Sequence, residues 1–149
     1  MSVIDLRTRT LLQQTFRRES LSLLRYVGEA FPWTVAAGDG ALKRVSEIVA
    51  EDRGATEALG RFLFRRRIPP SFSGAYPSGF TTLNFLSLEY LLPRLVDTQR
   101  KALAELESDA AAVTDIDAKT ELEKLLAVKR LHLTELEALK VPRGESTKV

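Results

Sequence analysis

Apolar side chains recur at intervals of three and four residues along most of the chain, the spacing that gathers them on one face of an α-helix. The pattern predicts four helices, at about residues 5–30, 41–66, 81–108 and 114–140. Amphipathic helices of this length can bury their apolar faces against one another. The sequence therefore predicts an all-α fold, a four-helix bundle.

The connection between the second and third helices is long and rich in proline, glycine and serine. Residues 68–80 carry no helical spacing. Fully extended, this segment reaches roughly 43 Å, whereas a helix of about 25 residues is about 37 Å long. The segment can therefore cross the whole bundle, which lets the second and third helices run parallel. Within the third helix, Pro93 predicts a kink.

Aromatic residues lie in and near the loops of the predicted bundle. They are Trp33 in the first loop and Phe72, Tyr76 and Phe80 in the long connection. Loop aromatics commonly anchor a connection to the helices beneath it. Lining a ligand cleft is the alternative.

Two ionisable residues interrupt the apolar face of the last helix. Lys129 and the single histidine, His132, take positions of a three-and-four spacing shared with leucines: Leu122, Leu125, Lys129, His132, Leu136 and Leu139. Burying an ammonium group without a partner costs several kcal/mol. Lys129 is therefore expected to meet a buried carboxylate, unless it extends to an exposed end of the bundle while His132 stays in the core as a hydrogen-bonded residue.

Carboxylates also fall on the inward faces of the other helices. Glu19 lies on the stripe of the first helix, and Glu51 interrupts the stripe of the second. Both are equally far from the middle of the first loop, so they are expected to face each other at one height and to offer Lys129 a partner. On the third helix, Glu89 or Asp97 is expected at the height of His132.

Composition limits the classes of protein to which the chain can belong. Its 149 residues suit one domain, with the bundle at residues 1–140 and a disordered tail at 141–149. A formal net charge of +2 gives no indication of nucleic-acid binding. The chain has no cysteine, no apolar leader and no stretch long enough to span a membrane, so a soluble, cytoplasmic protein is expected.

Three consecutive arginines, residues 65–67, end the second predicted helix just before Pro69 and Pro70. Cations in a last helical turn are favoured by the helix macrodipole. The alternative is a patch that binds phosphate or a membrane surface.

The order of these charged residues resembles the ferritin-like superfamily, which includes the bacterioferritins and rubrerythrins. The resemblance covers nearly all of residues 5–140. In that family a first-helix glutamate is followed seven residues later by a tyrosine, as Glu19 is by Tyr26. The resemblance implies a ferritin-like four-helix bundle with one long crossover between its second and third helices, and a di-metal centre of iron or manganese between them.

Two departures fall on the family's metal ligands. The second-helix Glu-x-x-His motif corresponds to Glu51 and Gly54, so glycine replaces the histidine. The fourth-helix motif corresponds to Lys129 and His132, so lysine replaces the bridging glutamate. The third-helix acid corresponds to Asp97 or Glu89. Since a cation repels a metal ion, we expect Lys129 to pair with Glu19 or Glu51 in place of the metal.

These features give three hypotheses for function. The first is a protein without oxidase chemistry that acts as a homo-oligomer, such as a dimer, or binds a protein partner. The second is an iron- or manganese-binding oxidoreductase or iron-storage protein whose ligands are Glu19, Glu51, Asp97 and His132. The third is an acid–base or Schiff-base enzyme that uses Lys129 with a lowered pKa and needs a pocket reaching the core.

Overall fold

The computed structural model describes residues 3–71 and 74–142, and this part of the chain is helical without strands. The prediction of an all-α fold is confirmed. Over these residues there are five α-helices and two short 3-10 helices. In chain order they are α1 (Leu6–Ser20), α2 (Leu23–Val27), η1 (Ala36–Gly38), α3 (Asp39–Arg65), η2 (Ser78–Leu83), α4 (Leu88–Ala112) and α5 (Ile116–Ala138).

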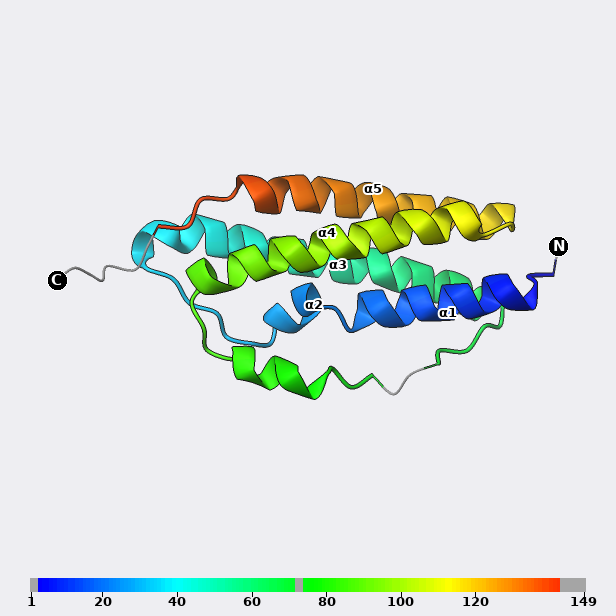
Figure 1. Ribbon diagram of the computed structural model, residues 1–149, viewed down its shortest axis with the longest axis horizontal. Helices are drawn as coiled ribbons and strands as arrows, with labels where there is room; N and C mark the ends of the chain where they lie inside the picture. Colours follow the sequence, from blue (N-terminus) through cyan, green and yellow to red (C-terminus); the bar gives the residue numbers. More distant parts are fainter. Residues whose placement is uncertain (1–2, 72–73, 143–149) are drawn as a thin grey trace.

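The long helices lie side by side along one axis (Figure 1). Helix α5 packs against α3 and α4, and α1 packs against the same two helices. Helices α3 and α4 run in the same direction, and the segment between them returns along the length of the molecule, past α1 and α2 (Figure 1). The centre of the molecule is therefore reached by side chains from α1, α3, α4 and α5.

The prediction of one continuous helix over residues 5–30 is wrong, because the structure has two helices there. Helix α1 ends at Ser20, and Leu21 leaves the helical conformation at φ −112° and ψ 24°. Ser22 then begins α2, where its side chain accepts a hydrogen bond from the backbone N–H of Arg25 at 3.2 Å. A serine at this position stabilises a new helix start. Tyr26 therefore belongs to a separate short helix.

The predicted start of the third long helix, at residues 81–82, is also wrong. Both threonines lie in η2, and α4 begins only after Ser87, whose side chain accepts a hydrogen bond from the N–H of Tyr90 at 3.2 Å. Phe85, expected on the apolar face, is 67% exposed and has a φ of 61°. Because non-glycine residues seldom adopt positive φ within a helix, the chain turns here. Helix α4 continues through Pro93.

Aromatic side chains attach the returning segment to α2. The Tyr26 ring lies 5.1 Å from that of Tyr76 and 5.3 Å from that of Phe80, measured between centroids. The Tyr26 hydroxyl donates a hydrogen bond to Asn84 Oδ1 at 2.6 Å. Trp33 donates a hydrogen bond to the backbone carbonyl of Phe85 at 3.1 Å. These contacts agree with the expectation that loop aromatics anchor the connection, whereas Phe72 lies outside the described residues.

The interior consists of two apolar clusters with a polar layer between them. One cluster lies around Leu12, Leu59, Leu106 and Leu122, and the other around Leu24, Ile48, Leu95 and Leu136. Every long helix contributes at least one buried polar side chain between the two. These side chains are Thr15, Glu19, Asp52, Thr56, Gln99, Lys129 and His132.

After α5, Leu139 and Val141 still pack against the second apolar cluster. The predicted disordered tail overlaps this packed stretch, and the rest of it, residues 143–149, lies outside the described residues. None of the described helices combines the length and the apolar character that crossing a membrane requires.

Candidate functional site

Three buried charges from three helices meet in the polar layer. The ammonium nitrogen of Lys129 lies 2.7 Å from Glu19 Oε1 on α1 and 3.0 Å from Asp52 Oδ1 on α3. The Lys129 side chain is 1% exposed and both carboxylate side chains are fully buried. The prediction that Lys129 is buried beside acids of the first and second long helices is therefore observed, with one of the two partners predicted correctly.

The surroundings of Lys129 act on its charge in opposite directions. Burial disfavours the charged ammonium group, whereas the negative charges of Glu19 and Asp52 and their hydrogen bonds favour it. The carboxylates have the larger combined effect, so the pKa of Lys129 lies above its ordinary value of 10.5. Lys129 therefore carries a positive charge at neutral pH.

The expectation that Glu51 faces Glu19 is wrong. Glu51 is 48% exposed, and the neighbouring Asp52 points inward instead. Equal distances from the loop predict the height of a residue along the helix but not the direction of its side chain. The spacing of the buried residues does predict that direction, because Ile48, Asp52 and Leu59 follow the four-and-seven rhythm of one helix face.

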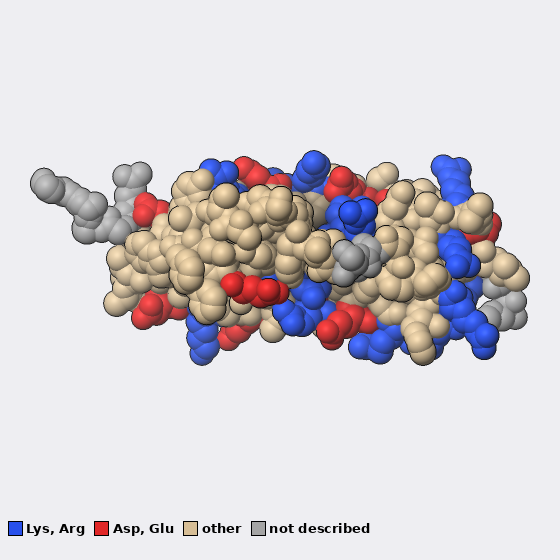
Figure 2. All heavy atoms as spheres, turned by 90° about the horizontal axis from the view of Figure 1, so that it is seen from below, with Lys and Arg blue, Asp and Glu red and all other residues tan. Residues whose placement is uncertain are grey.

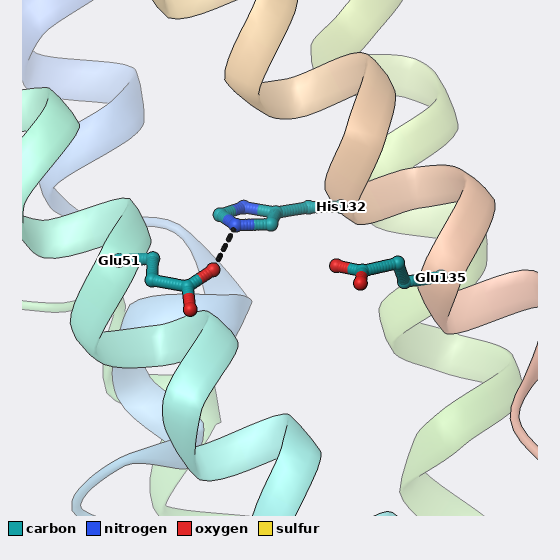
Figure 3. A group of neighbouring side chains, drawn as sticks. All are labelled: Glu51, His132 and Glu135. Atoms are coloured by element: carbon teal, nitrogen blue, oxygen red, sulfur yellow. Dashed lines mark hydrogen bonds and ion pairs between the residues drawn. The ribbon is translucent and has the colours of Figure 1, made fainter.

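A second group of ionisable side chains lies where α3 and α5 meet. His132 Nε2 lies 2.9 Å from Glu51 Oε1, and Glu135 points toward the same space (Figure 3). One ligand atom from each of Glu51, His132 and Glu135 lies within 4.8 Å of the other two. We call these three residues the surface triad. Their ligand types would suit a divalent metal ion such as Zn²⁺ or Mn²⁺.

An arginine already binds both carboxylates of the surface triad. Arg44 Nη2 lies 2.6 Å from Glu135 Oε1, and Arg44 Nη1 lies 3.0 Å from Glu51 Oε2. The hydrogen bond from Arg44, followed by that from His132, lowers the pKa of Glu51 below its ordinary value. The same contacts, with that to Glu47, raise the pKa of Arg44. The two carboxylates of the surface triad are therefore already neutralised in part by the guanidinium group of Arg44.

The other candidate ligands lie apart from both groups. Asp97, 77% exposed, pairs with Arg100 at 3.5 Å on the surface of α4. Glu89 is half-buried in the first turn of α4. The expectation that Asp97 or Glu89 would share a site with His132 is wrong, since Glu51 is the carboxylate found beside it. Gly54 is exposed, so its position does not face the interior.

The residues at the centre do not fit the di-iron group that the ferritin-like resemblance implies. Such a centre is usually held by four carboxylates and two histidines. Here a charged ammonium group lies within 3.0 Å of both buried carboxylates, at the place where a metal ion would bind them. His132, the only histidine, has its Nε2 2.9 Å from the half-exposed Glu51 and not beside the two buried carboxylates. No step of a metal-dependent reaction follows from this arrangement.

The Schiff-base hypothesis also lacks geometric support. A lysine nucleophile needs a lowered pKa and access for its substrate. The pKa of Lys129 is raised, and its side chain is buried. The three best-formed pockets of the described residues are lined by other side chains, not by Lys129.

Comparisons with known proteins assign no family to the chain. No family model, curated protein or solved structure matches it. The ferritin-like resemblance therefore rests on the motifs of the sequence, and the function is inferred from the geometry of the described residues.

Proposed function

We propose that the chain is a ferritin-like four-helix bundle, with one long crossover between α3 and α4, that holds no di-iron centre and acts as an oligomeric or partner-binding protein. In this view α1 and α2 together take the place of the first helix. The directions of the helices and the returning segment in Figure 1 support the proposal. So does the inward position of Glu19, seven residues before Tyr26.

The contact of Lys129 with two buried carboxylates carries the proposal. A metal ion would supply positive charge between Glu19 and Asp52, and the ammonium group at 2.7 and 3.0 Å from them supplies it instead. Removing one member of a buried ion pair is strongly destabilising. Expelling Lys129 to admit a metal would carry that cost. The buried group of Lys129, Glu19 and Asp52 therefore stabilises the fold, and any binding of a partner takes place at the surface.

Metal analysis and sedimentation of the purified full chain test the proposal. After incubation with ferrous iron and desalting, we expect well under one iron per chain and no burst of iron oxidation. Two irons per chain would contradict the proposal. Analytical ultracentrifugation should show a homo-oligomer, such as a dimer, or a stable complex with a protein partner, whereas a monomer without any partner would contradict the second half of the proposal.

A single-metal protein is a second candidate, favoured by the surface triad. Glu51, His132 and Glu135 offer one nitrogen and two oxygen ligands within 4.8 Å. Protein metal sites of three such ligands bind Zn²⁺, Mn²⁺ or Fe²⁺. Here the metal would compete with Arg44 for the two carboxylates.

Substitution of Arg44 separates the two candidates. If Arg44 neutralises the surface triad in place of a metal, Arg44→Gln should bind Zn²⁺ at least tenfold more tightly than the wild type in a calorimetric titration. Arg53→Gln, on the same helix and exposed, is the matched control and should leave Zn²⁺ binding unchanged. Micromolar binding of Zn²⁺ by the wild type, lost in His132→Gln, would favour the single-metal protein instead.

A further inference from the structure

An apolar groove lies along the last turns of α3, outside both ionic groups. Its volume is about 1330 Å³, above the roughly 300–1,000 Å³ of common small-molecule pockets. The apolar part of its lining comes from α1, α3 and the residues that follow α3: Phe16, Leu63, Phe64, Ile68, Pro69 and Pro70. Phe64 is 84% exposed. A large aromatic ring left in solvent beside a concave apolar surface indicates a place where an apolar group binds.

Arginines surround this groove. Arg9, Arg61, Arg65 and Arg67 line it, with Glu57 as its single acid. None of the four arginines forms an ion pair with any residue in the ranges 3–71 and 74–142, whereas many other arginines do. Figure 2 shows basic side chains gathered toward the end of the molecule where α1 begins and α3 ends. The groove therefore combines an apolar wall with an excess of positive charge.

The backbone at Arg67 gives a second, independent observation. Helix α3 ends in a Schellman motif, in which the N–H of Ile68 donates to the carbonyl of Leu63 at 2.9 Å and the N–H of Arg67 to that of Phe64 at 3.0 Å. The residue after the cap in this motif is usually glycine, because its φ is positive. Here it is Arg67, with a φ of 59°. The chain thus has an arginine where glycine would be less strained.

We propose that this groove binds one free, single-chain amphiphile with an anionic head, such as a long-chain fatty acid. The hydrocarbon chain would lie against Phe16, Phe64 and Ile68, where burial of apolar surface is favourable. The head would bind the arginines, whose planar guanidinium groups match a carboxylate or phosphate with paired hydrogen bonds. The site lies outside both ionic groups, so this proposal does not depend on whether the chain binds metal.

The shape of the groove favours a single chain over a membrane surface. A bilayer presents a nearly flat face, so Arg9 on α1 and Arg67 beyond α3 could reach head groups while the concave apolar wall between them stayed unfilled. A single hydrocarbon chain can enter the concavity while its head stays at the rim. The charge of the rim excludes a cationic amphiphile for the same reason that it favours an anionic one.

Binding of palmitate to the full chain tests the proposal. Titration below the concentration at which palmitate forms micelles should show one molecule bound per chain, and methyl palmitate, which has no charge, should bind at least tenfold more weakly. Arg67→Gly is the most informative variant. It should raise the urea midpoint of unfolding, because glycine relieves the positive φ, and yet weaken palmitate binding about tenfold.

Other variants and ligands show whether the binding has another cause. Arg61→Gln should also weaken palmitate binding, and Arg130→Gln, exposed on α5 and paired with Glu107, should not. The proposal is overturned if Arg67→Gly binds palmitate as tightly as the wild type. It is also overturned if palmitate does not bind, or if the chain binds only vesicles of phosphatidylglycerol and phosphatidylcholine, or only an acidic helical peptide.

Discussion

Lys129 on α5 and Glu19 on α1 touch at 2.7 Å, although neither helix packs extensively against the other. The lysine reaches across the middle of the molecule, between α3 and α4, to make this contact. The carboxylate of Asp52 on α3 completes the group at 3.0 Å. A charged side chain in the core therefore adds a direct contact between two helices that otherwise meet mainly through α3 and α4.

Removal of the ammonium group should destabilise the protein. Lys129→Met leaves Asp52 buried without a cation and Glu19 with only the partly exposed Arg18, at 3.4 Å. We expect a loss of about 3 kcal/mol in the free energy of unfolding at pH 7. Urea denaturation measures the loss, which should shrink at acid pH as the stranded carboxylates take up protons. Lys124→Met, exposed on the same helix, is the control. No loss at pH 7 would mean that the buried charges contribute nothing.

Neutralising the whole group should restore much of that loss. A variant with Lys129→Met, Glu19→Gln and Asp52→Asn holds none of these three charges, so the cost of leaving the two carboxylates without the lysine disappears. We expect it to recover at least half of the free energy lost in Lys129→Met, measured by the same denaturation at pH 7. If the triple variant is less stable than Lys129→Met, the contact of Glu19 with Arg18 at 3.4 Å outweighs the cost of leaving the carboxylates without the lysine.

The raised pKa of Lys129 gives the stability a definite dependence on alkaline pH. Since the folded-state pKa lies above 10.5, the folded protein holds this proton more tightly than the unfolded chain does. The contribution of Lys129 is therefore complete below pH 10.5 and is lost as the pH rises through the folded-state value. The difference in unfolding free energy between wild type and Lys129→Met should stay constant from pH 8 to 10 and fall above that range. If the difference in unfolding free energy grew as the pH rises above 10, the pKa of Lys129 in the folded protein would be lowered and not raised.

Gly54 should be replaceable by alanine with a gain in stability. It lies inside α3, and a Cβ added there has no heavy atom within 4 Å. Alanine in a helix interior is favoured over glycine by roughly 1 kcal/mol. Thermal unfolding of Gly54→Ala should show this gain. Gly60→Ala, in the same helix, should gain less, because its Cβ would lie 3.0 Å from the ring of Phe16.

The Tyr26 hydroxyl should matter to the attachment of the returning segment. Tyr26→Phe removes the hydrogen bond to Asn84 Oδ1 and should cost about 1 kcal/mol of unfolding free energy. Tyr90→Phe is the control: Tyr90 is 45% exposed and loses only a hydrogen bond with Arg94 at the surface, so its substitution should change stability by less than about 0.5 kcal/mol. Equal effects of the two substitutions would indicate that Asn84 finds another partner at no cost.

Apolar spacing predicted the helical class and the burial of the unusual core residues. Glu19, Lys129 and His132 interrupt regular rows of leucines, and all three are buried as that spacing predicts. Asp52 was missed because the height argument selected Glu51, although the spacing from Ile48 to Leu59 passes through Asp52. A one-residue error turns a side chain by about 100° around a helix. The direction in which each side chain of α3 points could therefore be predicted only from all the buried positions of that helix taken together.

Helix ends were harder to predict than helix faces. The apolar spacing continues from Leu12 through Glu19 to Leu23, so nothing in it marks the break that Ser22 makes. The start of α4 depends on the turn at Phe85, which has a positive φ. The conformational preferences of phenylalanine do not predict such a turn. The surface triad was missed in part because Glu135, and Arg44 that binds it, lie on polar faces, where apolar spacing carries no information.

The polar layer also has a consequence for the axial alignment of the helices. Two apolar clusters alone would allow α5 to shift along its neighbours by a heptad, since leucines would meet leucines in either position. With the charges present, such a shift would set Leu122 or Leu136 against Glu19 and Asp52 and leave Lys129 among apolar side chains. Only one alignment satisfies all three charges. We therefore expect the neutral triple variant to fold into helices yet to sample more than one alignment, visible as additional amide resonances.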